Sequence, residues 1–340
     1  MSVVYLMGGG DHDHDYGLAG LFDGLVEVLG YDAVHDLPEN PTMHLSSYAA
    51  RDHCGLDSDR CYESRLSTSY YGNYWQLRER LTGAPSDTII VLGKPDAESR
   101  QVIEASDKAN GKRFPIIAVD YSDQVADRRA EYEQCAGRPL AAYFKRELPI
   151  GADWGYPLPL SYPASRVGTL DFEAKNGLAY YATTHGGGAP GKPRIAIAEA
   201  LGAMWHGSEL IGPGIHLTAG QEKGTRLSPE ELHERMRVAL VGISWNGAVN
   251  VDCNRTWENF AFGLAQVAEY PRIQIPNVPE HGKHCLYAKS PDEVPGYVSV
   301  LLDNTAYARE MAKAGHEHFL KWHCSRARAE YLLDIVSKVA

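Results

Sequence analysis

Short, uninterrupted apolar runs separate longer amphipathic stretches along this chain of 340 residues. Three of these runs, Val3–Met7, Thr88–Leu92 and Ile116–Val119, are each followed by glycine or aspartate. A continuous apolar run of this length is typical of a strand that helices cover on both faces, as in a parallel sheet. The stretches between the runs, such as Leu18–Leu29 and Ala97–Asn110, are candidate helices. The pattern therefore predicts an α/β fold.

The alternation of apolar runs and amphipathic stretches is interrupted by a proline-containing segment, residues 147–170, which divides the chain into two halves. Four prolines fall there (Pro149, Pro157, Pro159 and Pro163), so we expect a linker with little regular structure. Alternation then resumes, with candidate strands at Gly177–Thr183 and Val238–Ile243 and candidate helices at Ile195–Met204, Thr256–Leu264, Thr305–Leu320 and Ser325–Val339. We expect two domains, residues 1–163 and 164–340, with a last helix that can cross back to the first.

Composition excludes several classes of function. The chain has 33 basic and 44 acidic residues, a net charge of −11, which disfavours unspecific binding to nucleic acid or to anionic membranes. Its start lacks the basic segment of a signal peptide, and no apolar run approaches the about 18 residues that span a bilayer. The six cysteines form no CxxC pair, which favours reduced thiols and a cytoplasmic location.

One block of residues carries a family resemblance. Cys253–Gly263 reads Cys-Asn-Arg-Thr-Trp-Glu-Asn-Phe-Ala-Phe-Gly and resembles the Arg-x-[Phe/Trp]-Glu-x-x-Ala-x-Gly block of spore-maturation-type glycosyltransferases. Leu227–Glu231, the tail from Ala312 to Arg328, and Tyr143–Glu147 resemble other segments of that group. The likeness is good over about residues 225–335 and thin over residues 1–140.

The resemblance implies the GT-B fold, in which two Rossmann-like domains with parallel sheets face each other across a cleft. It implies an enzyme that moves a sugar from a nucleotide-diphosphate donor to a hydroxyl acceptor. The donor would lie on the second domain and the acceptor on the first. Such enzymes usually work without a metal, so we expect no metal and no cofactor besides the nucleotide-sugar co-substrate.

The same block supplies candidate donor-binding residues. The resemblance gives Glu258 the ribose of the donor, and Arg255 can serve the phosphates. Without the resemblance, Glu258 would be an exposed carboxylate favoured by the positive end of a helix. Many retaining members have a second glutamate eight positions earlier, where this chain has Asn250. An amide can also bond to a sugar, so the stereochemistry and the sugar stay open.

A glycine-rich loop, Thr183–Gly191, supplies further candidates. Its backbone N–H groups and the following helix can cradle a pyrophosphate, with charge neutralised by basic residues. The residues concerned are Thr184, Gly186, Gly187, Lys192 and Arg194. The loop matches neither the Walker A spacing nor GxGxxG, and a plain surface loop is the alternative.

The loop Gly8–Gly17 follows the first predicted strand and holds the candidate catalytic residues. Histidine titrates near neutrality and suits the deprotonation of an acceptor hydroxyl. We expect His12 or His14 as the base, Asp13 to orient it, and Asp11 to contact the acceptor. A metal site and a solvated acidic loop are the alternatives.

Lys94 and Asp120 lie just after two other predicted strands, where contacts with an acceptor would occur. Turn residues are the alternative for both. Three other functions remain open: a nucleotide-sugar epimerase or hydrolase of similar fold, a DNA-base-modifying glycosyltransferase, and a nucleotide-sugar binding protein without activity. The hypothesis of a DNA-base-modifying enzyme is supported by five arginines in the first half of the chain, which could bind DNA phosphates: Arg51, Arg60, Arg65, Arg78 and Arg80.

Overall fold

The computed structural model describes residues 4–7, 16–37, 84–180, 193–194, 196–197, 200–201, 229–245 and 252–339. The chain divides into two compact units. The N-terminal unit comprises Met1–Pro159 and Ser325–Ala340, and the C-terminal unit comprises Leu160–Cys324. The chain therefore passes between the units twice, after Pro159 and after Cys324.

The N-terminal unit is built on a parallel sheet with the strand order β2-β1-β3-β4-β5-β6. Its strands are β1 (Val4–Met7), β2 (Val34–Leu37), β3 (Ile89–Leu92), β4 (Ile116–Asp120), β5 (Ala142–Lys145) and β6 (Tyr156–Pro157). Its helices are α1 (Tyr16–Leu29), α4 (Ala97–Asn110), α5 (Arg129–Ala136) and α11 (Ser325–Val339), with a 3₁₀ turn at Tyr31–Ala33. Every residue of β3 and β4 is buried, as expected of strands covered on both faces.

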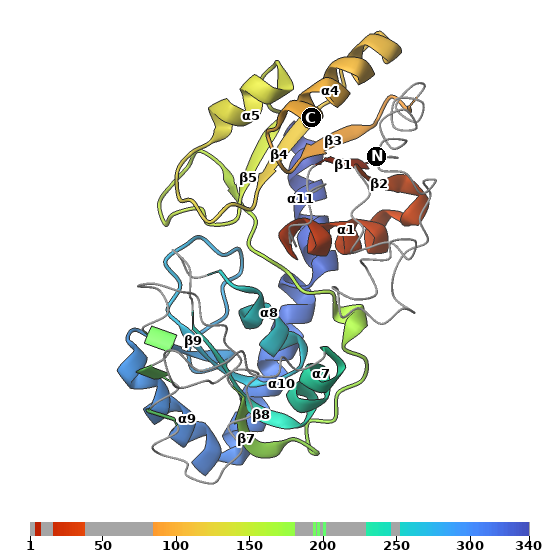
Figure 1. Ribbon diagram of the computed structural model, residues 1–340. Coiled ribbons are helices and arrows are strands. Elements are labelled where there is room, and N and C mark those ends of the chain that lie inside the picture. Colours follow the sequence, from red (N-terminus) through yellow and green to blue (C-terminus); the bar gives the residue numbers. More distant parts are fainter. Residues whose placement is uncertain are drawn as a thin grey trace, which may run out of the picture. The chain divides into compact units, whose positions relative to one another are not determined.

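Helix α11 returns to the N-terminal unit and packs beside α1 (Figure 1). The contact depends on Gly24 of α1, because a Cβ atom there would lie 2.0 Å from the carbonyl oxygen of Ser325. Only a residue without a side chain permits this approach of the two helices.

The C-terminal unit has a second parallel sheet, with the order β10-β9-β8-β7. Its strands are β7 (Asn176–Tyr180), β8 (Ala239–Ser244), β9 (Ala265–Glu269) and β10 (Cys285–Ala288). Its helices are α7 (Pro229–Val238), α8 (Asn254–Ala261), α9 (Val294–Asp303) and α10 (Thr305–Trp322), with 3₁₀ turns at Ala164–Arg166 and Pro291–Glu293. One apolar core joins β8, β9 and β10 to α9 and α10.

The predicted α/β class with parallel sheets is confirmed. Residues 147–170 contain only the two-residue strand β6 and one 3₁₀ turn, close to the expectation for a linker. Strands β5 and β9 were not expected, because polar residues interrupt their apolar pattern. Lys145 and Gln266 are nevertheless fully buried in these strands. Within the described residues, no helix combines the length and the apolar character needed to cross a lipid bilayer.

A buried lysine joins several elements of the C-terminal unit. Lys175 is 1% exposed, and its ammonium donates to the carbonyl oxygens of Met236, Arg237, Ala239 and Phe262 at 2.9–3.4 Å. These carbonyls belong to the end of α7, the start of β8 and the residue after α8. The single side chain thus holds the ends of three elements together.

We expect Lys175→Met to lower the free energy of unfolding by about 2–4 kcal/mol at pH 7, because buried carbonyls lose a charged donor. Burial lowers the pKa of Lys175 to about 8. The unfolded chain therefore binds more protons than the folded chain above that pH, so wild-type stability relative to the variant should rise between about pH 8 and pH 10. Urea unfolding followed by circular dichroism at pH 7 and pH 9.5 tests both effects. Lys338→Met, at an exposed ion pair, is the matched control, and equal stability of Lys175→Met and this control would refute the role.

Candidate active site

The carboxyl end of β8 and the first turn of α8 form the centre of the candidate site. Ser244 is the last residue of β8, and its Oγ lies 2.8 Å from Oγ1 of Thr256 in α8. The same Oγ lies 3.3 Å from the thiol of Cys253, the residue before the helix. These contacts fix the start of α8 against the end of the strand, which is where open α/β sheets bind their ligands.

A small hollow opens at this place. Its volume is about 10 Å³, enough for one water molecule. Ser244 and Thr256 line it together with Asp252, Trp257, Glu269 and Tyr287. Ala268, Pro271 and Ile275 complete the lining, so the hydroxyl and carboxylate groups face a hollow whose wall is mainly apolar.

Arg255 and Glu258, two of the predicted donor-binding residues, form an ion pair on α8. Nη1 of Arg255 lies 2.6 Å from Oε2 of Glu258, and the two side chains are 24% and 12% exposed. Their spacing of three residues places them on one face of the helix. Another face of the helix is buried: Trp257 and Phe260 lie on it and pack inside the unit. The pair is therefore mostly buried, reaches the surface in part, and holds the Glu258 carboxylate in a fixed position.

Arg194 comes to the same strand end by another route. Its Nε donates to the carbonyl oxygen of Trp245, the residue after β8, at 3.3 Å. The structure thus brings three of the predicted donor-binding residues to α8 and to the end of β8. The other predicted donor-binding residues lie outside the described part of the chain: Asn250, Thr184, Gly186, Gly187 and Lys192.

Residues 8–15 of the predicted catalytic loop also lie outside the described part of the chain, and they include Asp11, His12, Asp13 and His14. Lys94 and Asp120 are described. They follow or end the neighbouring strands β3 and β4, so both lie at the carboxyl edge of the N-terminal sheet. Lys94 is exposed, whereas Asp120 is fully buried.

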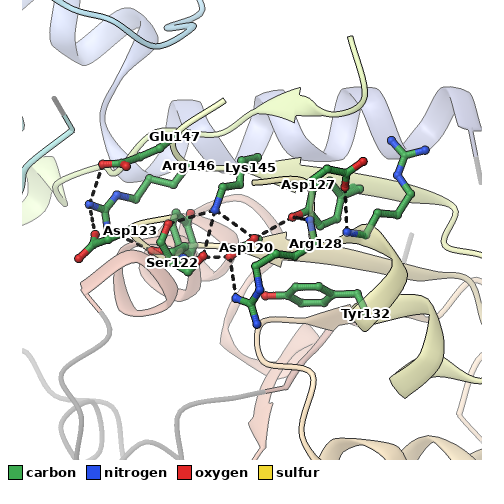
Figure 2. A network of polar contacts seen from close by, with 12 residues as sticks. Asp120, Ser122, Asp123, Asp127, Arg128, Tyr132, Lys145, Arg146 and Glu147 are labelled. Atoms are coloured by element: carbon green, nitrogen blue, oxygen red, sulfur yellow. Dashed lines mark hydrogen bonds and ion pairs between the residues drawn. The ribbon is translucent and has the colours of Figure 1, made fainter. Parts of the chain in front are cut away.

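Asp120 is the centre of a buried polar network (Figure 2). One oxygen, Oδ2, accepts from the Tyr143 hydroxyl at 2.7 Å and from the Lys145 ammonium at 3.0 Å. The other, Oδ1, accepts from the backbone N–H of Ser122 at 3.0 Å and lies 3.6 Å from Arg128. Because the carboxylate is buried and bonded on both oxygens, Asp120 can affect a ligand only by positioning its partners, such as Lys145.

The network extends along the edge of the sheet. Arg146 lies 2.6 Å from Asp123 and 3.2 Å from the buried carboxylate of Glu147, as the left side of Figure 2 shows. Sequence reasoning missed these partners, although Lys145, Arg146 and Glu147 stand in a row at the end of β5. A lysine at the end of a strand that is buried on both faces is the signal that indicates a buried partner.

The protonation states in the network follow from its geometry. Burial favours a raised pKa for Asp120, but the hydrogen bonds from Ser122 and Tyr143 and the charge of Lys145 outweigh it, so the pKa lies below its usual value. Burial lowers the pKa of Lys145, against the opposing effect of Asp120. Burial and the bond to Asp120 raise the pKa of Tyr143. The network thus holds a charged carboxylate and a neutral phenol at neutral pH.

Among the described residues, no group of three histidine, cysteine, aspartate or glutamate side chains is arranged to hold a metal ion. The four described cysteines, Cys135, Cys253, Cys285 and Cys324, form no disulfide.

We expect Asp120→Asn to destabilise the protein by about 3–5 kcal/mol at pH 7, because it leaves the Lys145 charge buried without its partner. The pKa of Asp120 is lower in the folded than in the unfolded chain, so its contribution is complete above about pH 5 and is lost as the pH falls. The difference between wild type and variant should therefore shrink as the pH falls from about 5 to about 2.5 in urea unfolding experiments. Asp334→Asn, in an exposed ion pair with Lys338, is the control, and a difference that does not change with pH would contradict this account.

Comparison with known families identifies the C-terminal part of the chain. Residues 194–334 match the family described as glycosyl transferase-like. This range includes Arg194, Arg255 and Glu258. A search of curated proteins finds no match.

Solved structures share the fold over the whole chain. HepE from Anabaena, in complex with UDP, is 11% identical with a TM-score of 0.58 and covers 99% of this chain and 100% of its own. A glycosyltransferase from Rickettsia africae is 7% identical with a TM-score of 0.62 and covers 99% and 98%. An alpha-glucosyltransferase in complex with UDP and a 13-mer DNA is 10% identical with a TM-score of 0.59 and covers 98% of each.

The predicted GT-B fold and the predicted class of enzyme are therefore confirmed. The structural likeness establishes the fold, and the match over residues 194–334 establishes the glycosyl transferase-like domain that contains the candidate donor site. The chain thus has the GT-B fold, and its residues 194–334 form a glycosyl transferase-like domain.

Proposed function

We propose that the C-terminal unit binds the donor at α8, with Glu258 on the ribose and Arg255 on the phosphates. The observation that carries this proposal is the half-buried Arg255–Glu258 pair, which lies on the helix beside the carboxyl end of β8. Arg194, at the same strand end, supplies a second positive charge. Asn250 and the loop with Thr184, Gly186, Gly187 and Lys192 complete the proposed donor site.

The nucleotide in this proposal is a uridine diphosphate. HepE, which shares the fold, was crystallised with UDP and with UDP-glucose. The block from Arg255 to Gly263 supports the finer proposal that the chain belongs to the spore-maturation-type group. No cofactor besides the nucleotide sugar is proposed, and the lack of a disulfide among the described cysteines supports a cytoplasmic location.

The acceptor in this proposal is a hydroxyl compound bound by the N-terminal unit. His12 or His14 acts as the base, Asp13 orients it, and Asp11, Lys94 and Asp120 contact or support the acceptor. The support for Lys94 and Asp120 is their position at the carboxyl edge of the sheet. Asp120 would act through Lys145, whose ammonium it holds.

Replacement of Glu258 tests the donor site. A thermal-shift panel of UDP, GDP, TDP and ADP and their sugars identifies the nucleotide, because a ligand that binds only the folded chain raises its unfolding temperature. We expect UDP and its sugars to give the largest shift. Glu258→Gln should weaken binding of that diphosphate by about 10- to 100-fold, as expected when a bond to a charged group is lost.

Glu280→Gln is the matched control, because Glu280 also pairs with a cation three residues away, Lys283, but on an exposed loop. Glu280→Gln should bind the nucleoside diphosphate with the affinity of the wild type. Normal binding by Glu258→Gln would reject the proposed site.

Release of free nucleotide tests the reaction. We expect turnover of the nucleotide sugar to rise strongly when the right acceptor is added from a panel of monosaccharides, glycans and duplex DNA, and to fall in His12→Ala and His14→Ala. Equal release without any acceptor would instead indicate an epimerase or hydrolase. Binding without turnover, unchanged in both histidine variants, would indicate a binding protein.

A further inference from the structure

Asp252 joins two segments that are far apart in the sequence. Its carboxylate is 2% exposed. Oδ2 accepts from the backbone N–H of Leu160 at 2.6 Å, and Oδ1 accepts from the indole Nε1 of Trp257 at 2.8 Å. Both oxygens therefore hold other parts of the C-terminal unit, a role that the sequence analysis did not predict.

The two partners of Asp252 have particular places in the chain. Leu160 is the first residue of the C-terminal unit. Trp257 lies on α8, directly before Glu258. Asp252 thus ties the helix that carries the proposed ribose ligand to the point where the chain enters the unit.

The point where the chain leaves the unit meets the same helix. The imidazole of His323 stacks on the indole of Trp257, with ring centroids 4.6 Å apart and an interplanar angle of 27°. The next residue, Cys324, is the last of the unit and forms a parallel bridge with Tyr162. Both ends of the C-terminal unit therefore converge on the Asp252–Trp257 pair.

Helix α8 needs such external support. It has only eight residues, and Cys253 at its N-cap makes no side-chain capping bond. A helix of this length is marginal by itself, so its position depends on tertiary contacts. Any rotation or shift of α8 moves Glu258, because neighbouring helical residues move as one body.

We propose that Asp252 is a positioning residue for donor binding: through Trp257 it fixes the rotation of α8 and thereby the place of the Glu258 carboxylate. This inference rests on the proposed role of Glu258. Asp252 does not itself need to touch the donor.

The chemistry of the site suggests the test variants. In Asp252→Asn the shape is kept, but the amide NH₂ must face either the N–H of Leu160 or that of Trp257, so one bond is replaced by two opposed donors. Trp257→Phe keeps an aromatic ring next to His323 and removes the N–H donor together with part of the buried indole. Asp171→Asn is the matched control, because Asp171 also accepts backbone N–H groups, from Glu173 and Ala174, but lies on an exposed loop of the same unit.

The experiment is a double-mutant cycle on the affinity for the nucleoside diphosphate that gives the largest thermal shift among UDP, GDP, TDP and ADP. Calorimetry on the full chain should show about tenfold weaker binding for Asp252→Asn and for Trp257→Phe, with Asp171→Asn unchanged. In the Glu258→Gln background, Asp252→Asn should cost no further affinity, because there is no carboxylate left to position. If Asp252 had only a structural role, Asp252→Asn would lower the unfolding temperature, and its effect on affinity would not depend on whether Glu258 is present.

Each outcome has a separate meaning. If Glu258→Gln weakens binding but Asp252→Asn and Trp257→Phe do not, the positioning role is wrong and the donor site stands. Additive losses in the double variant also overturn the positioning role. If Glu258→Gln binds normally, the proposed donor site fails, whatever the Asp252 variants do. Should Asp252→Asn fail to fold, Trp257→Phe alone and combined with Glu258→Gln provides the same cycle.

Discussion

Parallel pairing of strands is the constraint on which this structure depends. In both sheets every described pairing is parallel, so all strands of a sheet end at one edge. Because helices cover both faces, polar side chains find room mainly at the strand ends. The Asp120 network and the Ser244–Thr256 contact both lie at such ends. The polar side chains of both candidate sites therefore lie at the ends of strands, where the fold leaves space for them.

Each unit contains a fully buried lysine, and the two are stabilised in different ways. Lys145 faces the carboxylate of Asp120, which keeps charge balanced inside the N-terminal unit. Lys175 faces four backbone carbonyls, so it caps the ends of α7 and α8, and none of these four hydrogen-bond partners carries a charge. The desolvation cost of an ammonium is offset by full use of its hydrogen-bond donors in both places. These lysines hold the elements that carry the strand ends.

The sequence supported prediction best where local pattern and burial agree. The apolar runs of β3, β4 and β8 are buried strands, and the amphipathic stretches of α4 and α10 are helices close to the expected bounds. Prediction failed at β5 and β9, where Lys145 and Gln266 break the apolar pattern. Lys145 is buried against Asp120, 25 residues away in the sequence, and among the described residues the buried amide of Gln266 has no hydrogen-bond partner. The alternation of apolar and polar residues within a strand therefore predicts neither burial.

For the site, the sequence by itself determined the residue types and their helical spacing: Arg255 and Glu258 stand three apart and must share a face of any helix formed there. Tertiary structure alone decided that Arg194 reaches the end of β8, that Asp120 is buried under Lys145 and Tyr143, and that Asp252 joins Leu160 to Trp257. The physical reason is range. Helical periodicity acts over a few residues, whereas a buried hydrogen bond selects partners by position in space, across 92 residues in the case of Asp252 and Leu160.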